Sequence, residues 1–273
     1  MIDKSKFPIG IFDSGVGGLT VVKSIHKILP YENIVYFGDT ARVPYGSKSI
    51  QTVRKYAEED AEFLSSKNVK MIVVACNTVS SVALDIVQKK SNVLVCGVIF
   101  PGAKEAANVS QNNRIGVIGT KGTIQSNAYL NAIRQIKSNA NVISKSCPLF
   151  VSFVEENFIE HKATEIIAKE YLFSFTQEKI DTLILGCTHY PLLANIIQNV
   201  LGKNIKLIDS GVATAYEVKK QLEEKKLLNQ SKEKSNLQFF VSDDPEKFSE
   251  IGEKFLGQKL GRIRRANFSF NHQ

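Results

Sequence analysis

Two of the four cysteines directly follow similar apolar segments of the chain. Cys76 follows residues 71–75, Met-Ile-Val-Val-Ala, and Cys187 follows residues 182–186, Thr-Leu-Ile-Leu-Gly. Such runs are typical of buried parallel strands, whose carboxyl ends face the ligand crevice of an open α/β sheet. Two of these units can bring two sulfurs to one pocket from opposite sides. We expect that arrangement to suit a reaction that removes a proton from one face of a carbon atom and returns a proton to the other.

The four cysteines fall into two classes. Cys76 and Cys187 stand beside hydrogen-bonding residues and precede predicted helices. A helix N-terminus lowers the pKa of a thiol below its usual value of about 8.5, so both are predicted to be reactive. Cys96, inside an apolar run, and Cys147, before a proline, are interpreted as core residues.

Metal binding and redox chemistry are the first alternatives for paired cysteines. Structural zinc sites and redox disulfides use C-x-x-C pairs, and the sequence contains none. The only tight couple is Cys187 with His189, so we expect no metal. A cysteine hydrolase could use one thiol and this histidine, but it would leave the second cysteine unit unexplained.

A glycine-rich turn follows the first predicted strand. Residues 13–18, Asp-Ser-Gly-Val-Gly-Gly, expose backbone N–H groups at a helix start, which favours an anion. The turn lacks the glycine and lysine spacing of nucleotide-binding loops. A carboxylate at Asp13 would point into the same crevice as Cys76.

Three further segments contain polar residues of interest. Residues 39–46, Asp-Thr-Ala-Arg-Val-Pro-Tyr-Gly, either form an ordinary turn or offer a wall and backbone donors to a substrate carboxylate. His189 is distinguished by its adjacency to Cys187. Glu155 and Glu156, an acidic pair on a predicted helix, are expected to face water. The remaining histidines are interpreted as structural: His26, His161 and His272.

Strand-like and helix-like runs alternate along the chain, which predicts parallel βαβ construction. Apolar residues recur at helical spacing over residues 50–64 and 192–201, and Gly202 is placed to end the second helix. The predicted strands span residues 8–12, 33–37, 70–75, 93–99, 114–118, 141–144, 182–186, 205–208 and 237–241.

A faint internal repeat suggests two related halves. Residues 10–14 resemble residues 116–120, as the Cys76 segment resembles the Cys187 segment, and the members of these pairs are 106 and 111 residues apart. We therefore predict an α/β fold with two pseudo-symmetric domains, each a mainly parallel sheet flanked by helices, and an active site in the cleft between them. Residues 1–98 and 210–273 form the first domain, into which residues 99–209 are inserted as the second.

Bulk properties describe an ordinary globular protein. The chain is 43% apolar and 23% charged, and no apolar stretch approaches the ~20 residues that span a bilayer. The N-terminus lacks a signal-peptide pattern, and dispersed cysteines fit a reducing cytoplasm. The net charge of +8 includes a basic C-terminal stretch with Lys254, Lys259, Arg262, Arg264 and Arg265. Without aromatic stacking motifs this stretch does not predict nucleic-acid binding.

Several motifs in order resemble glutamate racemases, a family of cofactor-independent enzymes. The resemblance covers Gly-Ile-Phe-Asp-Ser-Gly-Val-Gly-Gly-Leu-Thr at residues 10–20, residues 38–46, and Ala-Cys-Asn-Thr at residues 75–78. It continues through residues 116–120, 147–150, 186–193 and 209–210. Only the last sixty or so residues carry no signature.

The resemblance implies the function of each motif. Cys76 and Cys187 are the two acid/base thiols, one on each side of the α-carbon of glutamate. Asp13 assists Cys76, His189 assists Cys187, and Glu155 is oriented towards His189. The implied substrate-binding residues are Asp13, Ser14, Tyr45, Gly46, Asn77, Thr78, Thr120, Thr188 and His189. The resemblance also implies no cofactor and no metal, and D-glutamate supply for peptidoglycan. We further expect a cytoplasmic homodimer.

One segment departs from the family pattern. Ser152, Phe153 and Asn157 stand where many relatives carry proline, leucine and glycine, which can shift the helix that carries Glu155. Phe100 also stands where we expect a polar residue.

Two other functions fit the same motifs. An aspartate racemase, or a related two-cysteine racemase or isomerase, differs by about one methylene of pocket depth, worth only ~1–3 kcal/mol. A non-catalytic module could bind an anion in the same cleft with inert sulfurs. Exchange of the substrate α-proton in deuterated water separates an enzyme from such a module.

Overall fold

The computed structural model describes residues 3–266 of the 273-residue chain. Ten strands alternate with helices in this part of the chain: β1 (Ile9–Asp13), β2 (Ile34–Gly38), β3 (Met71–Val74), β4 (Leu94–Gly97), β5 (Arg114–Gly119), β6 (Asn141–Ser146), β7 (Thr182–Gly186), β8 (Lys206–Asp209), β9 (Leu237–Val241) and β10 (Ile263–Arg265). They form two sheets, with strand orders β10-β9-β2-β1-β3-β4 and β6-β5-β7-β8. Every strand pair is parallel. The predicted α/β class with two mainly parallel sheets is confirmed.

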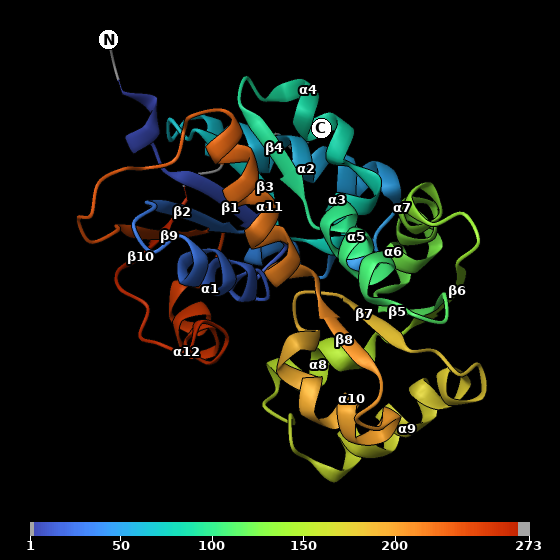
Figure 1. Ribbon diagram of the computed structural model, residues 1–273. Coiled ribbons are helices and arrows are strands. Elements are labelled where there is room, and N and C mark those ends of the chain that lie inside the picture. Colours follow the sequence, from blue (N-terminus) through green and yellow to red (C-terminus); the bar gives the residue numbers. More distant parts are fainter. Residues whose placement is uncertain (1–2, 267–273) are drawn as a thin grey trace.

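Helices surround both sheets (Figure 1). They are α1 (Leu19–Ile28), α2 (Ile50–Ser65), α3 (Asn77–Val82), α4 (Leu84–Lys90), α5 (Ile99–Val109), α6 (Lys121–Gln125), α7 (Ala128–Ile136), α8 (Leu149–Glu155), α9 (Lys162–Gln177), α10 (Ala194–Leu201), α11 (Ser210–Glu224) and α12 (Pro245–Leu256). Among the described helices, none combines the length and the apolar character needed to span a bilayer.

Local sequence explains where the predicted helices begin and end. The Ser49 side chain accepts a hydrogen bond from the Thr52 backbone N–H and caps α2, which buries Val53, Ala57 and Leu64 on one face. At the end of α10, Gly202 has a φ of 88°, a conformation that a residue with a Cβ rarely adopts. The predicted stop at Gly202 is therefore confirmed.

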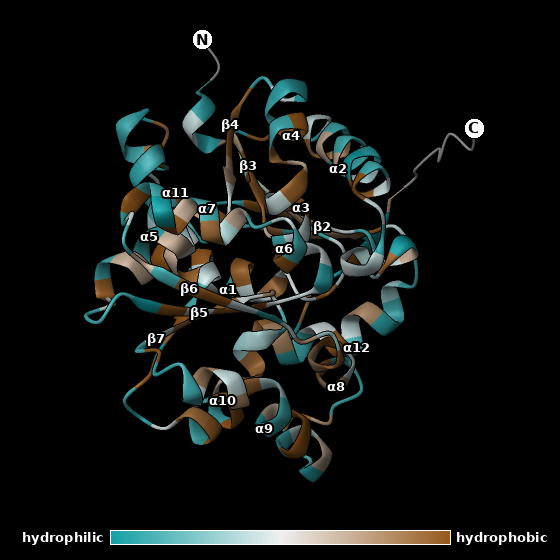
Figure 2. Ribbon diagram, turned by 90° about the vertical axis from the view of Figure 1, so that its right-hand side faces the viewer, coloured by the Kyte–Doolittle hydropathy of each residue, from teal (hydrophilic) through white to brown (hydrophobic). Residues whose placement is uncertain are grey.

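The strands form the apolar centre of each part of the molecule. Strands β1, β2, β3 and β7 are buried along their whole length, as expected for parallel strands covered on both faces. Figure 2 shows β3 and β4 largely in brown, with hydrophilic turns on the surrounding helices. All nine predicted strands are present. The prediction omitted β10 because it is a three-residue edge strand that ends in two exposed arginines.

The two sheets repeat one strand order. In the six-stranded sheet the order β2-β1-β3-β4 matches β6-β5-β7-β8 in the four-stranded sheet. Strand β5 therefore corresponds to β1, and β7 corresponds to β3. This equivalence agrees with the sequence repeat and gives the Cys76 and Cys187 segments the same place in their sheets.

The C-terminal segment completes the six-stranded sheet, since β9 pairs with β2 and β10 with β9. A buried ion pair between Lys70 and Glu32 fastens the connection before β9. The Lys70 ammonium also donates to the backbone carbonyls of Ser5 and Leu227, and Glu32 accepts from the Asn229 N–H. One buried cluster thus joins the N-terminal segment, the start of β3 and the connection between α11 and β9.

Replacing Glu32 with alanine leaves the Lys70 ammonium buried without its carboxylate. We expect the free energy of unfolding to fall by about 3–5 kcal/mol, as for other broken buried pairs. Urea denaturation measures this change. The matched control is Glu165→Ala, which breaks the exposed Glu165–Lys169 pair on α9 and should leave stability nearly unchanged. Equal stability of the two variants would show that the buried Lys70–Glu32 pair does not stabilise the fold as expected.

Candidate active site

Cys76 lies two residues after the end of β3, at the N-cap position of α3, and is 6% exposed. Its Sγ lies 3.9 Å from the Ser14 Oγ. Asp13 ends the adjacent strand β1 and accepts a hydrogen bond of 2.9 Å from the Gly18 backbone N–H. Because β1 and β3 are neighbours, Asp13, Ser14 and Cys76 meet at one edge of the six-stranded sheet.

The charge environment of Cys76 favours the protonated thiol. Burial raises the pKa of Cys76, and the negative charge of Asp13 raises it further. Burial also raises the pKa of Asp13, while the charge of His189 lowers it. The start of the following helix acts in the predicted direction, since the Val79 backbone N–H lowers the pKa of Cys76, but the net shift is upward and not downward as predicted. Helix α3 is only six residues long, and its effect is outweighed by the loss of water and by the nearby carboxylate.

Cys187 occupies the equivalent place after β7 and is also 6% exposed. Its Sγ lies 3.8 Å from the His189 Nδ1, and the His189 Nε2 lies 2.9 Å from the Glu155 Oε1. The predicted helix start at His189 is a short 3-10 turn over Tyr190–Leu193, and α10 begins only afterwards. The second thiol therefore heads a Cys–His–Glu chain of contacts.

His189 is a buried base with two polar partners. Burial lowers the pKa of His189, but its hydrogen bonds with Cys187 and Glu155 raise the pKa to about 10. Burial raises the pKa of Glu155, but the hydrogen bond and the charge of His189 outweigh this and lower it. The hydrogen bonds of His189 with Cys187 and Glu155 thus favour the protonated imidazole over the neutral one.

The Glu155 side chain remains 36% exposed, so it partly faces water as its position in an acidic pair suggested. It also contacts His189, as the family resemblance implied. It is the last residue of α8, which starts at Leu149. Asn157 replaces the family glycine and has a φ of 62°, a conformation that asparagine tolerates better than most residues. The departure in sequence therefore leaves the end of the helix able to direct Glu155 towards His189. Phe100, the other departure, lies half exposed on α5.

Asn77, Thr78 and Thr120 connect the two sheets. The hydroxyls of Thr78 and Thr120 form a hydrogen bond of 2.9 Å, and Thr123 lies within 3.4 Å of both. The Tyr129 hydroxyl donates to the Asn77 Oδ1 over 2.7 Å. Residues after β3 thus contact residues after β5 through polar side chains.

Tyr45 and Gly46 are placed differently from each other. The Tyr45 hydroxyl donates to the buried carboxylates of Asp39 and Asp60, so this hydroxyl anchors the loop. Gly46 lies with its backbone against Thr120, and a Cβ at Gly46 would lie 2.6 Å from the Thr120 Cβ. The loop at residues 39–46 therefore reaches the second sheet through its glycine rather than through the tyrosine side chain.

Thr188, which follows β7, contacts residues that follow β1. Its carbonyl accepts a hydrogen bond of 3.0 Å from the Thr20 hydroxyl on α1. A Cβ on Gly17 would lie 2.3 Å from the Thr188 Oγ1 and 2.6 Å from the His189 Nδ1. Only glycine permits this close approach of the first glycine-rich turn to the Cys187 segment.

Several interactions place both cysteine segments at one site. The charge of Cys187 contributes to the raised pKa of Cys76, as that of His189 acts on Asp13. Two buried polar atoms here have no hydrogen-bond partner in the described part of the chain, namely the Asp13 Oδ1 and the Asn77 Nδ2. An acceptor and a donor left in this state suit the ammonium and carboxylate groups of an amino acid.

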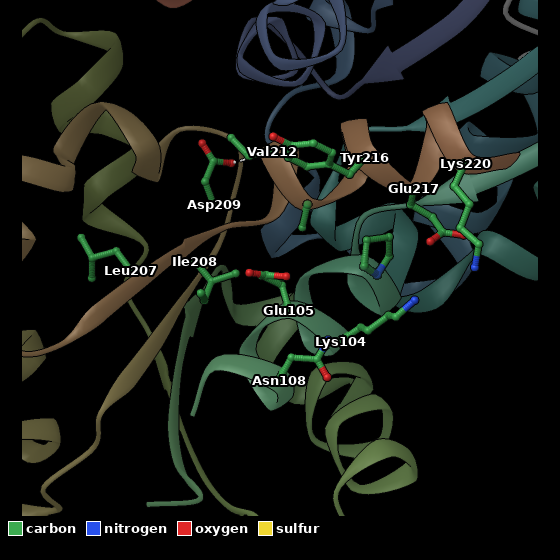
Figure 3. A pocket seen from close by; sticks show the side chains of 12 residues that line it. Lys104, Glu105, Asn108, Leu207, Ile208, Asp209, Val212, Tyr216, Glu217 and Lys220 are labelled. Carbon is green, nitrogen blue, oxygen red and sulfur yellow. Dashed lines mark hydrogen bonds between the residues drawn. The ribbon is translucent and has the colours of Figure 1, made fainter. Parts of the chain in front are cut away.

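One surface pocket lies away from the predicted site residues. The pocket in Figure 3 lies between α5, β8 and α11 and is lined by Lys104, Glu105, Asp209 and Tyr216 among others. It contains none of the predicted site residues. Within residues 3–266, no group of three or more His, Cys, Asp and Glu side chains is arranged to hold a metal ion. His272 lies outside the described residues.

Sequence reasoning missed Thr20, Thr123, Tyr129 and Phe255. Thr20 ends a recognised motif, but its bond to Thr188 depends on the meeting of two sheets. Thr123 and Tyr129 follow the predicted strand at residues 114–118 without a polar pattern of their own. Phe255, whose ring lies 5.3 Å from that of His189, belongs to the segment without a signature.

Residues 9–218 match the family model described as Asp/Glu/Hydantoin racemase. The chain belongs to this family. A glutamate racemase of Chlorobaculum tepidum is 54% identical over 257 residues, which cover 94% of each chain. The match runs almost end to end, so the resemblance stated from the motifs is confirmed.

Solved structures agree with this assignment. A glutamate racemase from Francisella tularensis, in complex with D-glutamate, is 43% identical, with a TM-score of 0.91 and coverage of 98% of this chain and 100% of that one. The RacE1 isoform from Bacillus anthracis is 39% identical with a TM-score of 0.92, covering 97% and 98%. An aspartate racemase from Picrophilus torridus is 20% identical with a TM-score of 0.55, which shows the shared fold alone.

The raised pKa of His189 makes its contribution to stability depend on pH. The pKa is higher in the folded chain than the ordinary value of 6.5, so this contribution is complete below about pH 6.5 and is lost as the pH rises through about 10. We expect the stability difference between the wild-type chain and His189→Gln to shrink over that range. Urea denaturation at several pH values measures it. A difference that grows with pH would contradict the assigned shift.

Proposed function

We propose that this chain interconverts L-glutamate and D-glutamate by a two-base mechanism and so supplies D-glutamate for peptidoglycan synthesis. Cys76 and Cys187 are the two bases. The observation that supports the proposal is the presence of two buried thiols at equivalent places in two sheets, each with its own ionisable partner and each near enough for the charge of one to act on the other. Near-full-length identity to glutamate racemases supports the substrate.

In this reaction one proton leaves one face of the substrate α-carbon, and another proton is added to the opposite face. In one direction the Cys187 thiolate removes the α-proton, and the Cys76 thiol donates its proton to the opposite face of the carbanion. In the other direction the roles exchange. The His189 imidazolium compensates negative charge on the Cys187 sulfur, and Glu155 holds the imidazole through its Nε2. Asp13 assists Cys76, since its charge acts on that sulfur.

The binding residues divide according to the charge of the substrate group. Asp13 has a buried acceptor available for the substrate ammonium, and Asn77 has a buried donor available for a carboxylate. Hydroxyl and backbone groups from both sheets complete the polar lining: Ser14, Gly46, Thr78, Thr120, Thr188 and His189, with Tyr45 holding the loop that presents Gly46.

Removing an α-proton beside a carboxylate is a demanding step. Enzymes lower barriers by roughly 8–23 kcal/mol, and preorganised electrostatics is usually the largest contribution. The donors from Asn77, Thr78 and Thr188 bear on the charge that develops at the substrate carboxylate. Burial of both sulfurs removes water that would otherwise screen these interactions.

The domain division proposed for this mechanism follows the sheets. Residues 1–98 with 210–273 contain the six-stranded sheet, and residues 99–209 contain the four-stranded sheet. The chain crosses between them before α5 and again at Asp209–Ser210. Asp13 and Cys76 belong to the first domain, and Glu155, Cys187 and His189 belong to the second. The homodimer stays a prediction.

Separate substitution of the two thiols tests the mechanism. We expect Cys76→Ser and Cys187→Ser each to lower racemisation by at least about a thousandfold, because a serine hydroxyl is far less acidic than a thiol and transfers the proton poorly. Circular dichroism of reactions started from each enantiomer measures turnover. Cys96→Ser, at a buried thiol outside the site, is the control and should retain activity. Near-normal turnover in either of the first two variants would refute the two-thiol mechanism.

Selectivity tests the substrate. We expect kcat/KM for glutamate to exceed that for aspartate by about 10–200-fold, the discrimination that one methylene provides. Parallel assays with both amino acids measure this ratio. A preference for aspartate would assign the chain to the alternative function, and absence of α-proton exchange with both would indicate a binding module.

A further inference from the structure

We propose that Phe255, on helix α12, is a positioning residue for His189 and acts across the junction between the two domains. Its ring fixes the imidazole between Cys187 and Glu155 and keeps water from it when the domains are closed. This inference rests on the proposed function and adds a residue that lies outside the matched family region at residues 9–218.

The contact between the two rings is close and well defined. Their centroids are 5.3 Å apart and their planes meet at 86°, the edge-to-face arrangement that aromatic pairs prefer. Phe255 is 1% exposed and His189 is 6% exposed. Water therefore has almost no access to the imidazole from the side that Phe255 covers.

The ring supplies a constraint that the hydrogen bonds of His189 do not. Contacts through Nδ1 to Cys187 and through Nε2 to Glu155 fix both ends of the imidazole. The first of these contacts is long, at 3.8 Å, so it restrains small rotations of the imidazole about its Cβ–Cγ bond less than a short hydrogen bond would. A second ring packed perpendicular to the imidazole opposes these rotations, and the backbone of Gly17 limits them further.

Helix α12 is held firmly to the first domain. A Cβ on Gly252 would lie 2.8 Å from a Leu19 methyl on α1, so the helices approach as closely as glycine allows. Phe248 packs on Tyr36 of β2 with ring centroids 5.9 Å apart. Phe255 thus belongs to one domain while His189 belongs to the other.

The contact consequently depends on domain closure. Both thiols are buried in this structure, so glutamate reaches them only when the domains separate. Separation also removes Phe255 from His189. The Cys187 half of the site is therefore fully ordered only in the closed state, whereas the Asp13–Cys76 half lies within one sheet.

Isotope effects on the two directions of racemisation provide the test. The variants are Phe255→Leu and Phe255→Met, which keep an apolar side chain without the ring. The control is Phe175→Leu, at a buried phenylalanine on α9 that lies in the core of the second domain. Because the two enantiomers have equal free energy, kcat/KM must change equally in both directions. The α-deuterium isotope effects can change unequally.

We expect kcat/KM to fall about tenfold in both Phe255 variants, as for a small misplacement of a catalytic group. The isotope effect should rise for the enantiomer whose α-deuteron Cys187 removes, since that transfer becomes slower. It should fall for the other enantiomer, for which donation by Cys187 becomes limiting. Phe175→Leu should leave the ratio of the two isotope effects at the wild-type value. A ratio that is also unchanged in the Phe255 variants would overturn the proposal.

A measurement independent of turnover completes the test. Nitrogen-15 NMR of labelled histidine follows the titration of His189, assigned by its loss in His189→Gln. Water admitted beside the imidazole relieves its burial, which raises the pKa of His189, and weakens its interactions with Cys187 and Glu155, which lowers it, so the titration of His189 should shift in Phe255→Leu and stay in place in Phe175→Leu. An unchanged titration would refute the positioning role. A wild-type chain that fails to racemise glutamate would instead refute the proposed function, while this titration would still report on the ring contact.

Discussion

The opposite charges beside the two buried sulfurs are the interaction on which the site depends. Cys76 adjoins the Asp13 carboxylate, which together with burial raises the pKa of its thiol. Cys187 adjoins the imidazolium of His189, which Glu155 holds from the other side. The surroundings of Cys76 therefore favour its neutral form, whereas Cys187 lies against a histidine. The proposed two-base mechanism needs one thiol as the proton donor and the other as the acceptor, and these roles exchange in the reverse direction.

The architecture produces this pair by using one strand order twice. Cys76 follows β3 and Cys187 follows β7, which are equivalent strands of the two sheets. The carboxyl ends of parallel strands carry the site in each half, and polar contacts such as Thr78–Thr120 and Thr20–Thr188 join the halves. The same contacts close the site to water. Closure strengthens the electrostatic interactions inside it, and it also makes every cross-domain contact conditional on the arrangement of the two domains.

Structural features that depend on local pattern could be predicted from the sequence. Apolar runs predicted nine strands, and paired cysteine segments predicted two related halves, because burial and strand period are encoded locally. Features that depend on packing could not be predicted. The Tyr45 hydroxyl bonds to the buried carboxylates of Asp39 and Asp60, and burial raises the pKa of Cys76 although a helix follows it. Phe255 meets His189 only because the C-terminal segment folds back onto the first sheet.

The pattern of deuterium incorporation during the first turnovers in deuterated water tests the two-base arrangement most directly. Each thiol exchanges its proton with solvent between turnovers, and each serves a different face of the substrate. Starting from one enantiomer, the account predicts that the newly formed enantiomer carries deuterium at its α-carbon while the remaining substrate carries almost none. Equal labelling of both enantiomers from the start, or a product that retains the original proton, would show that a single group serves both faces and would contradict the account.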